Sequence, residues 1–234
     1  MRVTGAVFDM DHTLFDRYAT LRSLAPFLTE RLAEDLVPGI GPDEFYRDLA
    51  EADRLHIVDG WEAIFGALAE RGILRKEAAY PRFRDALREA FRRNAVPFPF
   101  EDEFFSALRA RSLKIALITN GSAELQSAKL RLLGMAPRFD EVMIADGQSV
   151  AMKPDPEPFL RMADRLGEKP ENLLYVGDNP VNDVDGSRRA GYIPVWVRTT
   201  GVWRAGIERA PYEIDSIREL PGLIDSIRND NLEK

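Results

Sequence analysis

The sequence contains no cysteine, and this absence removes several classes of chemistry at once. Disulfide bonds, thiolate metal sites and cysteine nucleophiles are excluded, and the chain does not need an oxidising compartment. Long uninterrupted apolar segments are missing as well, because Asp9 breaks the apolar run after Arg2 before it reaches the length of a signal peptide. No other run is long enough to cross a bilayer. We therefore expect a cytoplasmic protein with no membrane association.

The chain has fewer basic than acidic residues, with 32 Lys and Arg against 39 Asp and Glu. The formal net charge of the 234-residue chain is -7, so the molecule as a whole repels phosphate backbones and anionic membranes. We therefore expect no nucleic-acid partner. The hydrophobic share of 45% is enough to fill a core, and the length suits one large domain or a core domain with a smaller companion.

The apolar run that ends at Phe8 predicts a buried β-strand, and two carboxylates follow it at once. Asp9 and Asp11 stand at the carboxyl end of this strand, where open α/β sheets bind their ligands. On this segment alone, a turn in which both aspartates cap backbone amides explains the pair equally well. The rest of the chain must decide between these two readings.

A long stretch without strand signals follows. Leucines recur at helical spacing from Leu21 to Leu36, and further helical patterns begin near Asp43, run over 61–68 until Gly72, and cover 83–91. This pattern predicts an all-helical domain over 15–96, inserted after the first strand. The remaining residues, 1–14 and 97–234, would then form the core domain.

From Pro97 onward, helix and strand signals alternate. Helices are predicted over 102–111, from a Ser122 cap to Gly134, from an Asp155 cap to Gly167, and up to about Ala190. Strands are predicted over 114–119, 142–144, 173–177 and 193–197. Pro194 near the start of the last strand suggests a position at the sheet edge. The alternation predicts an α/β fold with a Rossmann-like parallel sheet sandwiched by helices.

Polar residues gather after the predicted strands. Asp9 with Asp11, Thr119, and Asp178 with Asp183 follow three of them, and Lys153 stands in a loop. The carboxyl ends of parallel strands meet at one edge, so these side chains can converge on a single crevice. Converging carboxylates would take up protons unless a cation keeps them ionised. Since the ligands are oxygens alone, Mg²⁺ is the cofactor that suits them best.

The residue types indicate a division of labour between the two aspartates. Asp9 can act as a carboxylate nucleophile that forms an aspartyl-phosphate, and Asp11 can protonate a leaving oxygen and later take a proton from water. Both are therefore catalytic candidates.

The later polar residues can support that chemistry. Thr119, with the amides after it, can donate hydrogen bonds to phosphoryl oxygens, and Lys153 can neutralise charge shared by the phosphoryl group and the nucleophile. Asp178 can hold the metal directly, whereas Asp183 can steady the metal's waters or Lys153 from outside the inner ligand set.

Taken in order, these motifs resemble those of the haloacid dehalogenase (HAD) superfamily of phosphotransferases and phosphatases. The matching segments are Asp9-Met10-Asp11-His12-Thr13, Thr119-Asn120-Gly121, Lys153-Pro154 and Gly177-Asp178-Asn179-Pro180-Val181-Asn182-Asp183.

The resemblance implies covalent aspartyl-phosphate catalysis, phosphate binding by Thr119, Asn120 and Lys153, and Mg²⁺ held by Asp9, the backbone carbonyl of Asp11, and Asp178. It also implies that the helical insertion is a cap of the family's first type, which closes over the substrate.

The expected activity is Mg²⁺-dependent hydrolysis of a small phosphorylated metabolite of the nucleotide, sugar phosphate or phosphoglycolate class, by a monomer or homodimer. A phosphomutase, a phosphonate hydrolase and a catalytically silent metabolite-binding protein of the same fold are the alternatives. The phosphonate route would need a cap lysine to form a Schiff base, and Lys76 is the lysine available. A dehalogenase is disfavoured because such enzymes lack the second acidic residue, here Asp11.

Weaker signals concern substrate choice. Arg17 and Tyr18 follow the first motif, where the chain leaves the core, and could touch the leaving group. His56 lies in the predicted cap and could contribute to specificity, although a surface or packing role explains it as well. His12 is expected to shape its loop rather than to bind metal.

Overall fold

The computed structural model describes residues 2–56, 59–199 and 202–230, and the chain divides into two units. The core unit comprises Met1–Phe15 and Pro97–Lys234, and the helical insert comprises Asp16–Val96. The boundaries predicted from the sequence lie within one residue of these.

The core unit is built on a six-stranded parallel sheet with the strand order β3-β2-β1-β4-β5-β6, counted over the described residues. The strands are β1 (Gly5–Phe8), β2 (Lys114–Asn120), β3 (Glu141–Ala145), β4 (Leu173–Gly177), β5 (Ile193–Val197) and β6 (Tyr212–Ile214). The first strand of the chain therefore lies near the middle of the sheet, between β2 and β4. This arrangement confirms the predicted α/β class with a parallel sheet.

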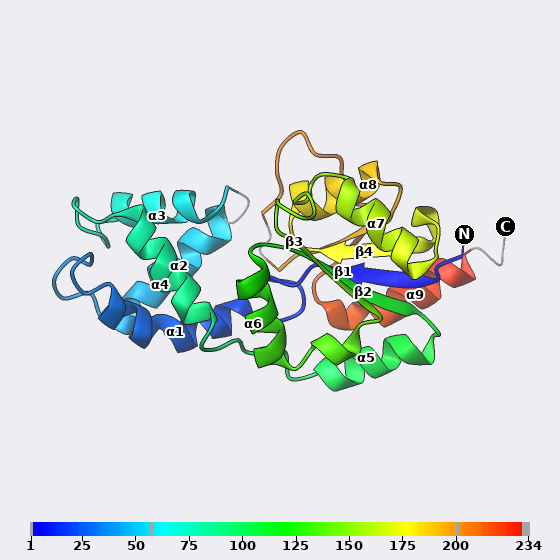
Figure 1. The fold of residues 1–234 in the computed structure, drawn as a ribbon, viewed down its shortest axis with the longest axis horizontal. Helices are drawn as coiled ribbons and strands as arrows, with labels where there is room; N and C mark the ends of the chain where they lie inside the picture. The colour runs from blue at the N-terminus through cyan, green and yellow to red at the C-terminus, as the bar shows by residue number, and fades with distance from the viewer. Residues whose placement is uncertain (1, 57–58, 200–201, 231–234) are drawn as a thin grey trace. The chain divides into compact units, whose positions relative to one another are not determined.

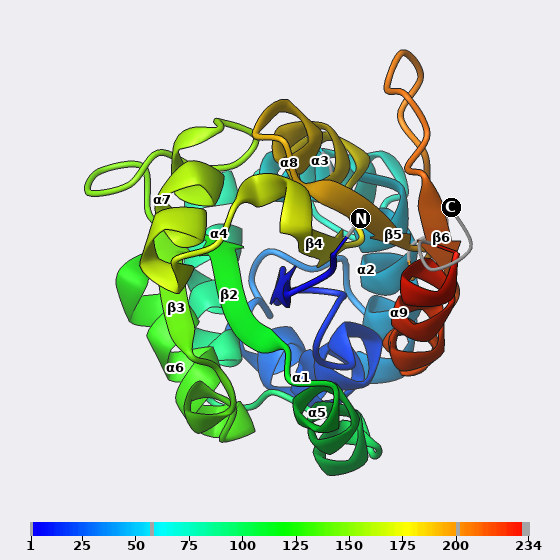
Figure 2. The same ribbon diagram turned by 90° about the vertical axis from the view of Figure 1, so that its right-hand side faces the viewer.

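Helices cover both faces of the sheet, as Figures 1 and 2 show from two directions. One face carries α5 (Glu101–Ala110), α6 (Ala123–Leu133) and α9 (Leu220–Asn229), and the other carries α7 (Glu157–Leu166) and α8 (Gly186–Arg189). Short 3₁₀ turns lie at Ala136–Arg138, Pro170–Asn172 and Ile217–Glu219, and a π-helical segment at Pro180–Asp185 leads into α8. In the described part of the chain, no helix has the length and apolar character needed to span a membrane.

Burial on both faces explains why the central strands carry almost unbroken apolar runs. Val7 and Ile118 pack with Phe159 and Met162 of α7 in one buried cluster. On the other face, the ring of Phe8 meets Phe104 of α5 edge to face at a centroid distance of 5.8 Å. Each such side chain contributes about 1.5–3 kcal/mol when it is fully buried.

The ends of α6 follow from its capping residues, as predicted. Ser122 Oγ accepts a hydrogen bond from the amide of Leu125, and Gly134 ends the helix in the left-handed conformation with φ of 65°. For α7, Asp155 also acts as a cap by accepting from the amide of Glu157, although the helix begins at Glu157. The Ser122 cap places α6 directly after β2, whose end carries Thr119.

The helical insert contains α1 (Arg17–Arg31), α2 (Pro42–His56), α3 (Trp61–Glu70) and α4 (Tyr80–Phe91). The first helix ends at Arg31, although leucine spacing predicted its continuation toward Leu36. After Arg31 the backbone continues in turns, in which the amide of Leu36 still donates to the carbonyl of Leu32, and Val37 then donates to the carbonyl of Ile73. Leu36 also forms a β-bridge with Leu74, so tertiary pairing begins where the leucine pattern ends.

The predicted edge position of the strand 193–197 is wrong. β5 lies between β4 and β6, and its pairing with β6 begins at Val195, which faces Tyr212. Pro194 precedes this pairing, so its missing N–H falls near the start of the strand, where proline is tolerated. Pro194 cannot donate a hydrogen bond to a neighbouring strand, as the sequence indicates. The reason it is tolerated is its place near the start of β5, and not a position of β5 at the sheet edge.

Candidate active site

Adjacent strands bring the first polar residues of the site together. Asp9 directly follows β1, its amide donates to the carbonyl of Val176 in β4, and Asp178 directly follows that strand. Thr119 lies near the end of β2, on the other side of β1. The predicted convergence of these residues at one sheet edge follows from the observed strand order.

A tight turn after Asp9 redirects the backbone. The carbonyl of Met10 accepts hydrogen bonds from the amides of Thr13 and Leu14, and His12 adopts a left-handed conformation with φ of 60°. Asp11 lies in this turn, and its carboxylate meets α6, where Lys129 Nζ contacts its two oxygens at 2.7 and 2.8 Å. The turn thus gives the two neighbouring aspartates different surroundings.

Lys153 is the charged centre of the site. Its Nζ atom lies 2.7 Å from Asp9 Oδ1, from Asp183 Oδ1 and from the hydroxyl of Tyr175. Burial alone would lower the pKa of Lys153, but Asp183 and Asp9 reverse this effect and hold the pKa well above its ordinary value. Lys153 therefore remains charged and offsets part of the negative charge around it.

Asn120 holds the backbone of Lys153. Its side-chain oxygen accepts from the Lys153 amide at 2.9 Å, and its side-chain nitrogen donates to the Lys153 carbonyl at 2.8 Å. From the sequence, Asn120 is expected to bind phosphate, and this stays a prediction. The structure places its side chain on the backbone of Lys153, which it fixes in place.

Asp9, Asp178 and Asp183 form a buried carboxylate cluster in which one oxygen from each lies within 4.8 Å of the others. Desolvation by burial, together with neighbouring negative charge, raises the pKa of Asp9 from 3.8 to about 7, despite the opposing effect of Lys153. Burial, Asp183 and Asp9 likewise raise the pKa of Asp178 well above its ordinary value. A divalent cation would offset this repulsion, and an all-oxygen donor set fits Mg²⁺.

The position of Asp183 depends on the residues around it. Its Oδ1 binds Lys153, and its Oδ2 accepts from the amide of Asn179 at 2.9 Å. A Cβ atom on Gly177 would lie 2.4 Å from the Asp183 carboxyl carbon, so only glycine permits this approach. These contacts fix the Asp183 carboxylate beside the Lys153 ammonium, and its supporting role beside the inner metal ligands stays a prediction.

Two tryptophans near the site pack against each other. Trp196 and Trp203 meet edge to face at a centroid distance of 4.7 Å in a small cluster with Val184. Trp196 does more than fill space, because its Nε1 donates to the carbonyl of Asp178 at 2.8 Å. This bond steadies the backbone of the candidate metal ligand.

Three polar residues of the site escaped the sequence analysis, namely Gln126, Lys129 and Tyr175. Gln126 and Lys129 share one face of α6, three residues apart, and both are buried. The sequence could have indicated them, because both lie on one face of a helix that follows Thr119 closely. They were missed because a polar helix face usually contacts solvent. Tyr175 lies inside the apolar strand β4 and gave no signal apart from its hydroxyl.

The specificity candidates in the helical insert differ in their surroundings. Arg17 is buried and binds Asp53, with Nη2 2.8 Å from Oδ1, so its charge is compensated within the insert. Tyr18 is half-buried, and His56 Nδ1 lies 3.9 Å from Asp59 Oδ2 on a more exposed surface. Lys76 is exposed.

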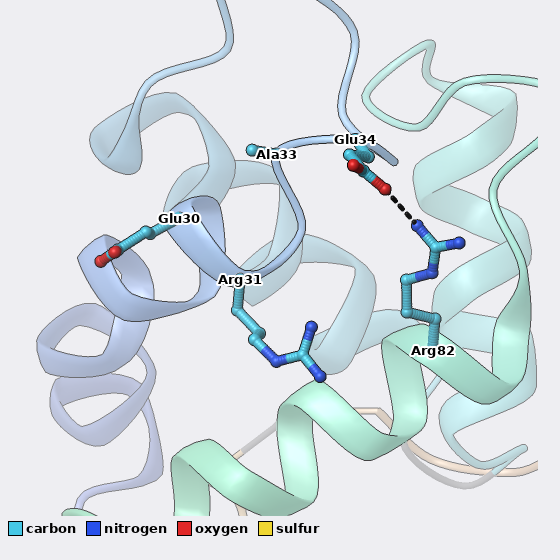
Figure 3. Close-up of a pocket in the computed structure, with 5 residues that line it drawn as sticks. All are labelled: Glu30, Arg31, Ala33, Glu34 and Arg82. Carbon is cyan, nitrogen blue, oxygen red and sulfur yellow. Dashed lines mark hydrogen bonds and ion pairs between the residues drawn. The ribbon is translucent and has the colours of Figure 1, made fainter.

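A surface hollow on the helical insert, shown in Figure 3, is lined by Glu30, Arg31, Ala33, Glu34 and Arg82. Arg82 pairs with Glu34 at 3.2 Å, and Arg31 pairs with Glu89 at 3.3 Å. Charge in the hollow is therefore balanced locally, unlike the charge around Lys153.

A sequence model of haloacid dehalogenase-like hydrolases matches residues 3–191. A phosphoserine phosphatase from Thermus thermophilus is 37% identical over 146 residues, covering 61% of this chain and 58% of the relative. A phosphoglycolate phosphatase from Aquifex aeolicus is 29% identical over 194 residues, covering 79% and 80%. The chain thus spans about three fifths of the length of the first relative and most of the second.

Solved structures share the fold over nearly the whole chain. The HAD-hydrolase YfnB from Bacillus subtilis superposes with a TM-score of 0.71 at 21% identity, covering 96% of this chain and 100% of its own. A HAD phosphatase from Thermococcus onnurineus gives a TM-score of 0.61 at 27% identity, covering 95% of this chain and 98% of that one. The parallel-sheet core with a helical insertion is therefore a recurring arrangement.

Proposed function

The chain belongs to the haloacid dehalogenase-like hydrolases, and from this premise we propose that it is a Mg²⁺-dependent phosphatase acting on small phosphate monoesters. The observation that carries the proposal is the position of Asp9. Its carboxylate lies in a buried acidic cluster, 2.7 Å from the Lys153 ammonium, at the carboxyl end of a central strand. Such a carboxylate can attack phosphorus if its charge is balanced.

In the first step, an Asp9 oxygen bonds to phosphorus while the bond to the leaving oxygen breaks. Asp11 gives its proton to that oxygen, so an alcohol departs and an aspartyl-phosphate remains. Bound Mg²⁺, held by Asp9, the Asp11 carbonyl and Asp178, would neutralise charge on the phosphoryl oxygens. Lys153 and Thr119 add fixed positive charge and a hydroxyl donor to the same group.

In the second step, Asp11 takes a proton from a water molecule as its oxygen attacks phosphorus. The bond between phosphorus and Asp9 breaks, inorganic phosphate forms, and the Asp9 carboxylate is restored. One residue thus acts as acid and then as base. This exchange of roles requires Asp11 to return to the same place in both steps.

The substrate class that we propose is a small phosphorylated metabolite. The named activities of similar proteins support this class, since they act on phosphoserine and phosphoglycolate. We assign catalysis to the core unit and the choice among such substrates to the helical insert. The nucleotide, sugar phosphate and phosphoglycolate classes remain the ones to compare.

The test is a panel of phosphate monoesters assayed with Mg²⁺ and ranked by kcat/KM, together with Asp9→Asn. We expect Asp9→Asn to abolish phosphate release while the protein stays folded. Asp164→Asn, an exposed change of the same type on α7, should retain full activity. Undiminished activity of Asp9→Asn would refute the nucleophile assignment.

The same panel separates the alternatives. Interconversion of sugar phosphates without phosphate release would indicate a mutase. Tight binding of a metabolite without turnover would indicate a silent binding protein. Borohydride trapping with a phosphonoaldehyde, compared with Lys76→Met, would reveal a Schiff-base route.

A further inference from the structure

Two side chains of α6 donate hydrogen bonds to the carboxylate of Asp11. Lys129 Nζ lies 2.7 Å from Oδ1 and 2.8 Å from Oδ2, and Gln126 Nε2 lies 3.2 Å from Oδ2. Because both carboxylate oxygens are engaged from one side, rotation of the carboxylate breaks at least one of these contacts. The contacts with Lys129 and Gln126 therefore favour one orientation of the Asp11 carboxylate.

Lys129 is held rigidly. Its side chain is only 3% exposed, and its ammonium lies 5.8 Å from the ring centroid of Phe15, itself buried in the core unit. A flexible surface lysine could follow Asp11 into several orientations, whereas a buried one cannot. The lysine thus offers its charge at a fixed point.

Gln126 connects Asp11 to the residues after β2. The same Nε2 that reaches Asp11 lies 2.6 Å from Thr119 Oγ1 and 2.8 Å from the carbonyl oxygen of Asn120. A Gln126 amide in this place fixes the distance between the carboxylate of the first motif and the hydroxyl of the second. These are the two groups that would face the phosphoryl group from neighbouring strands.

Stability alone does not account for a lysine at position 129. Burying an ammonium costs several kcal/mol of lost hydration, and apolar residues in place of both members of a buried ion pair are often as stabilising or more so. A helix that only had to cover the sheet would be served by leucine or methionine. The charge at this position therefore has a use, and the group that it touches is Asp11.

We propose that Lys129 and Gln126 are positioning residues that hold the ionised Asp11 carboxylate in the orientation in which it takes a proton from water in the second step. The proposal rests on the proposed phosphatase function, in which Asp11 acts as acid and then as base. Neither α6 residue is assigned a proton transfer or a bond to phosphorus in the reaction. Their effect passes through Asp11, and through Thr119 in the case of Gln126.

The experiment uses p-nitrophenyl phosphate, whose leaving group departs without a proton. The first step then does not require Asp11, whereas hydrolysis of the aspartyl-phosphate does. Rapid-quench single turnovers with Mg²⁺ resolve nitrophenolate release from phosphate release for the wild type and for Lys129→Met. We expect the first rate to change less than about threefold and the second to fall about 10²-fold, the size of effect typical of general-base catalysis.

Lys114→Met is the matched control, because Lys114 also forms an ion pair, with Glu168 at 3.0 Å, and lies at the start of β2. We expect this variant to leave both rates unchanged. Equal loss of both rates in Lys129→Met would show a merely structural role, and unchanged rates would show that Asp11 needs no such support. Either result overturns the proposal. If Lys129→Met does not fold, Gln126→Leu carries the same test.

Crystal structures of the wild type and Lys129→Met provide a readout that is independent of activity. We expect the Asp11 carboxylate of the variant to leave its single position beside Gln126. An unmoved, well-ordered Asp11 would overturn the positioning role even if the wild type were an active phosphatase. A wild type that hydrolyses no phosphate ester would instead refute the proposed function. The position of Asp11 in the two crystal structures would then still test whether Lys129 orients its carboxylate.

Discussion

The hydroxyl of Tyr175 accepts a 2.7 Å hydrogen bond from the ammonium of Lys153. It also donates to the carbonyl of Ile118 at 3.1 Å, so the hydroxyl is satisfied in both directions. Burial keeps the pKa of Tyr175 well above its ordinary value, and the hydroxyl therefore stays neutral. This neutral group adds a hydrogen bond to Lys153 without adding another negative charge to the cluster.

Removing this hydroxyl should affect both activity and stability. We expect Tyr175→Phe to lower the free energy of unfolding by about 1–2 kcal/mol through the lost buried hydrogen bonds. We also expect kcat/KM to fall roughly 10-fold, a loss of about 1.4 kcal/mol, because Lys153 loses a partner that orients it. Denaturant unfolding and steady-state kinetics measure the two effects.

Tyr192→Phe is the matched control. Tyr192 belongs to the same aromatic cluster, and its buried hydroxyl donates to the carbonyl of Phe159 at 2.7 Å, away from Lys153. A similar loss of stability with unchanged kcat/KM is expected. Equal kinetic losses in both variants would attribute the Tyr175 effect to general loosening of the core.

The acidic cluster predicts a specific pH dependence of stability in metal-free protein. The pKa of Asp9 is about 7 in the folded state, against an ordinary 3.8. The folded state therefore binds this proton more tightly, and its contribution is complete below pH 3.8 and disappears as the pH rises to about 7. In EDTA, we expect the free energy of unfolding of the wild type to fall across this window by a few kcal/mol relative to Asp9→Asn.

Denaturant titrations at several pH values between 4 and 8 measure this difference. Saturating Mg²⁺ should reduce it, because a bound cation favours the ionised carboxylates in the folded state. Parallel pH profiles of the wild type and Asp9→Asn in EDTA would contradict the raised pKa of Asp9.

Magnesium should stabilise the folded protein. A ligand that binds only the folded state at one hundred times its Kd adds about 2.7 kcal/mol, which corresponds to a rise in Tm of about 5–10 °C for a chain of this size. Asp178→Asn should abolish most of this rise by removing a charged ligand, whereas Asp164→Asn should preserve it. Thermal unfolding with EDTA or Mg²⁺ measures the shifts, and an undiminished rise in Asp178→Asn would exclude Asp178 as a ligand.

Asn120 provides a test of how Lys153 is held. Asn120→Ala removes both hydrogen bonds to the Lys153 backbone, and we expect kcat/KM to fall about 10- to 100-fold, a loss of about 1.4–2.7 kcal/mol. Asn94→Ala, which removes an amide hydrogen bond to Ser23 on the exposed surface of the helical insert, should leave kcat/KM unchanged. Steady-state assays of the two variants decide whether the Lys153 backbone needs this support.

Much of the fold was predictable because local patterns and tertiary structure agree. Apolar runs ending in polar residues located the central strands, and capping residues such as Ser122 and Gly134 located the ends of α6. The predictions failed where segments far away in the sequence determine the local structure. Leucine spacing could not reveal the bridge between Leu36 and Leu74, and Pro194 could not reveal that β6 lies outside β5.

The site was predictable to a similar degree. Residues directly after strands, such as Asp9 and Asp178, follow from the rule that parallel sheets bind ligands at their carboxyl ends. Lys129 and Tyr175 do not, because each lies inside a regular element and its role depends on a partner far away in the sequence. Asn120 illustrates a third case. The sequence indicated that it belongs to the site, but not that its side chain holds the backbone of Lys153.

The central position of β1 has a consequence for the order in which the molecule folds. Gly5 pairs with Lys114 on one side and with Leu173 on the other, so β1 can pair only after the chain beyond the helical insert has been synthesised. In the insert, α1 packs on α2 and α2 on α3, and contacts between neighbours in sequence generally form sooner than distant ones. During synthesis, β1 would therefore stay unpaired while the insert folds, and Asp9 and Asp178 could come together only after β4 has been made.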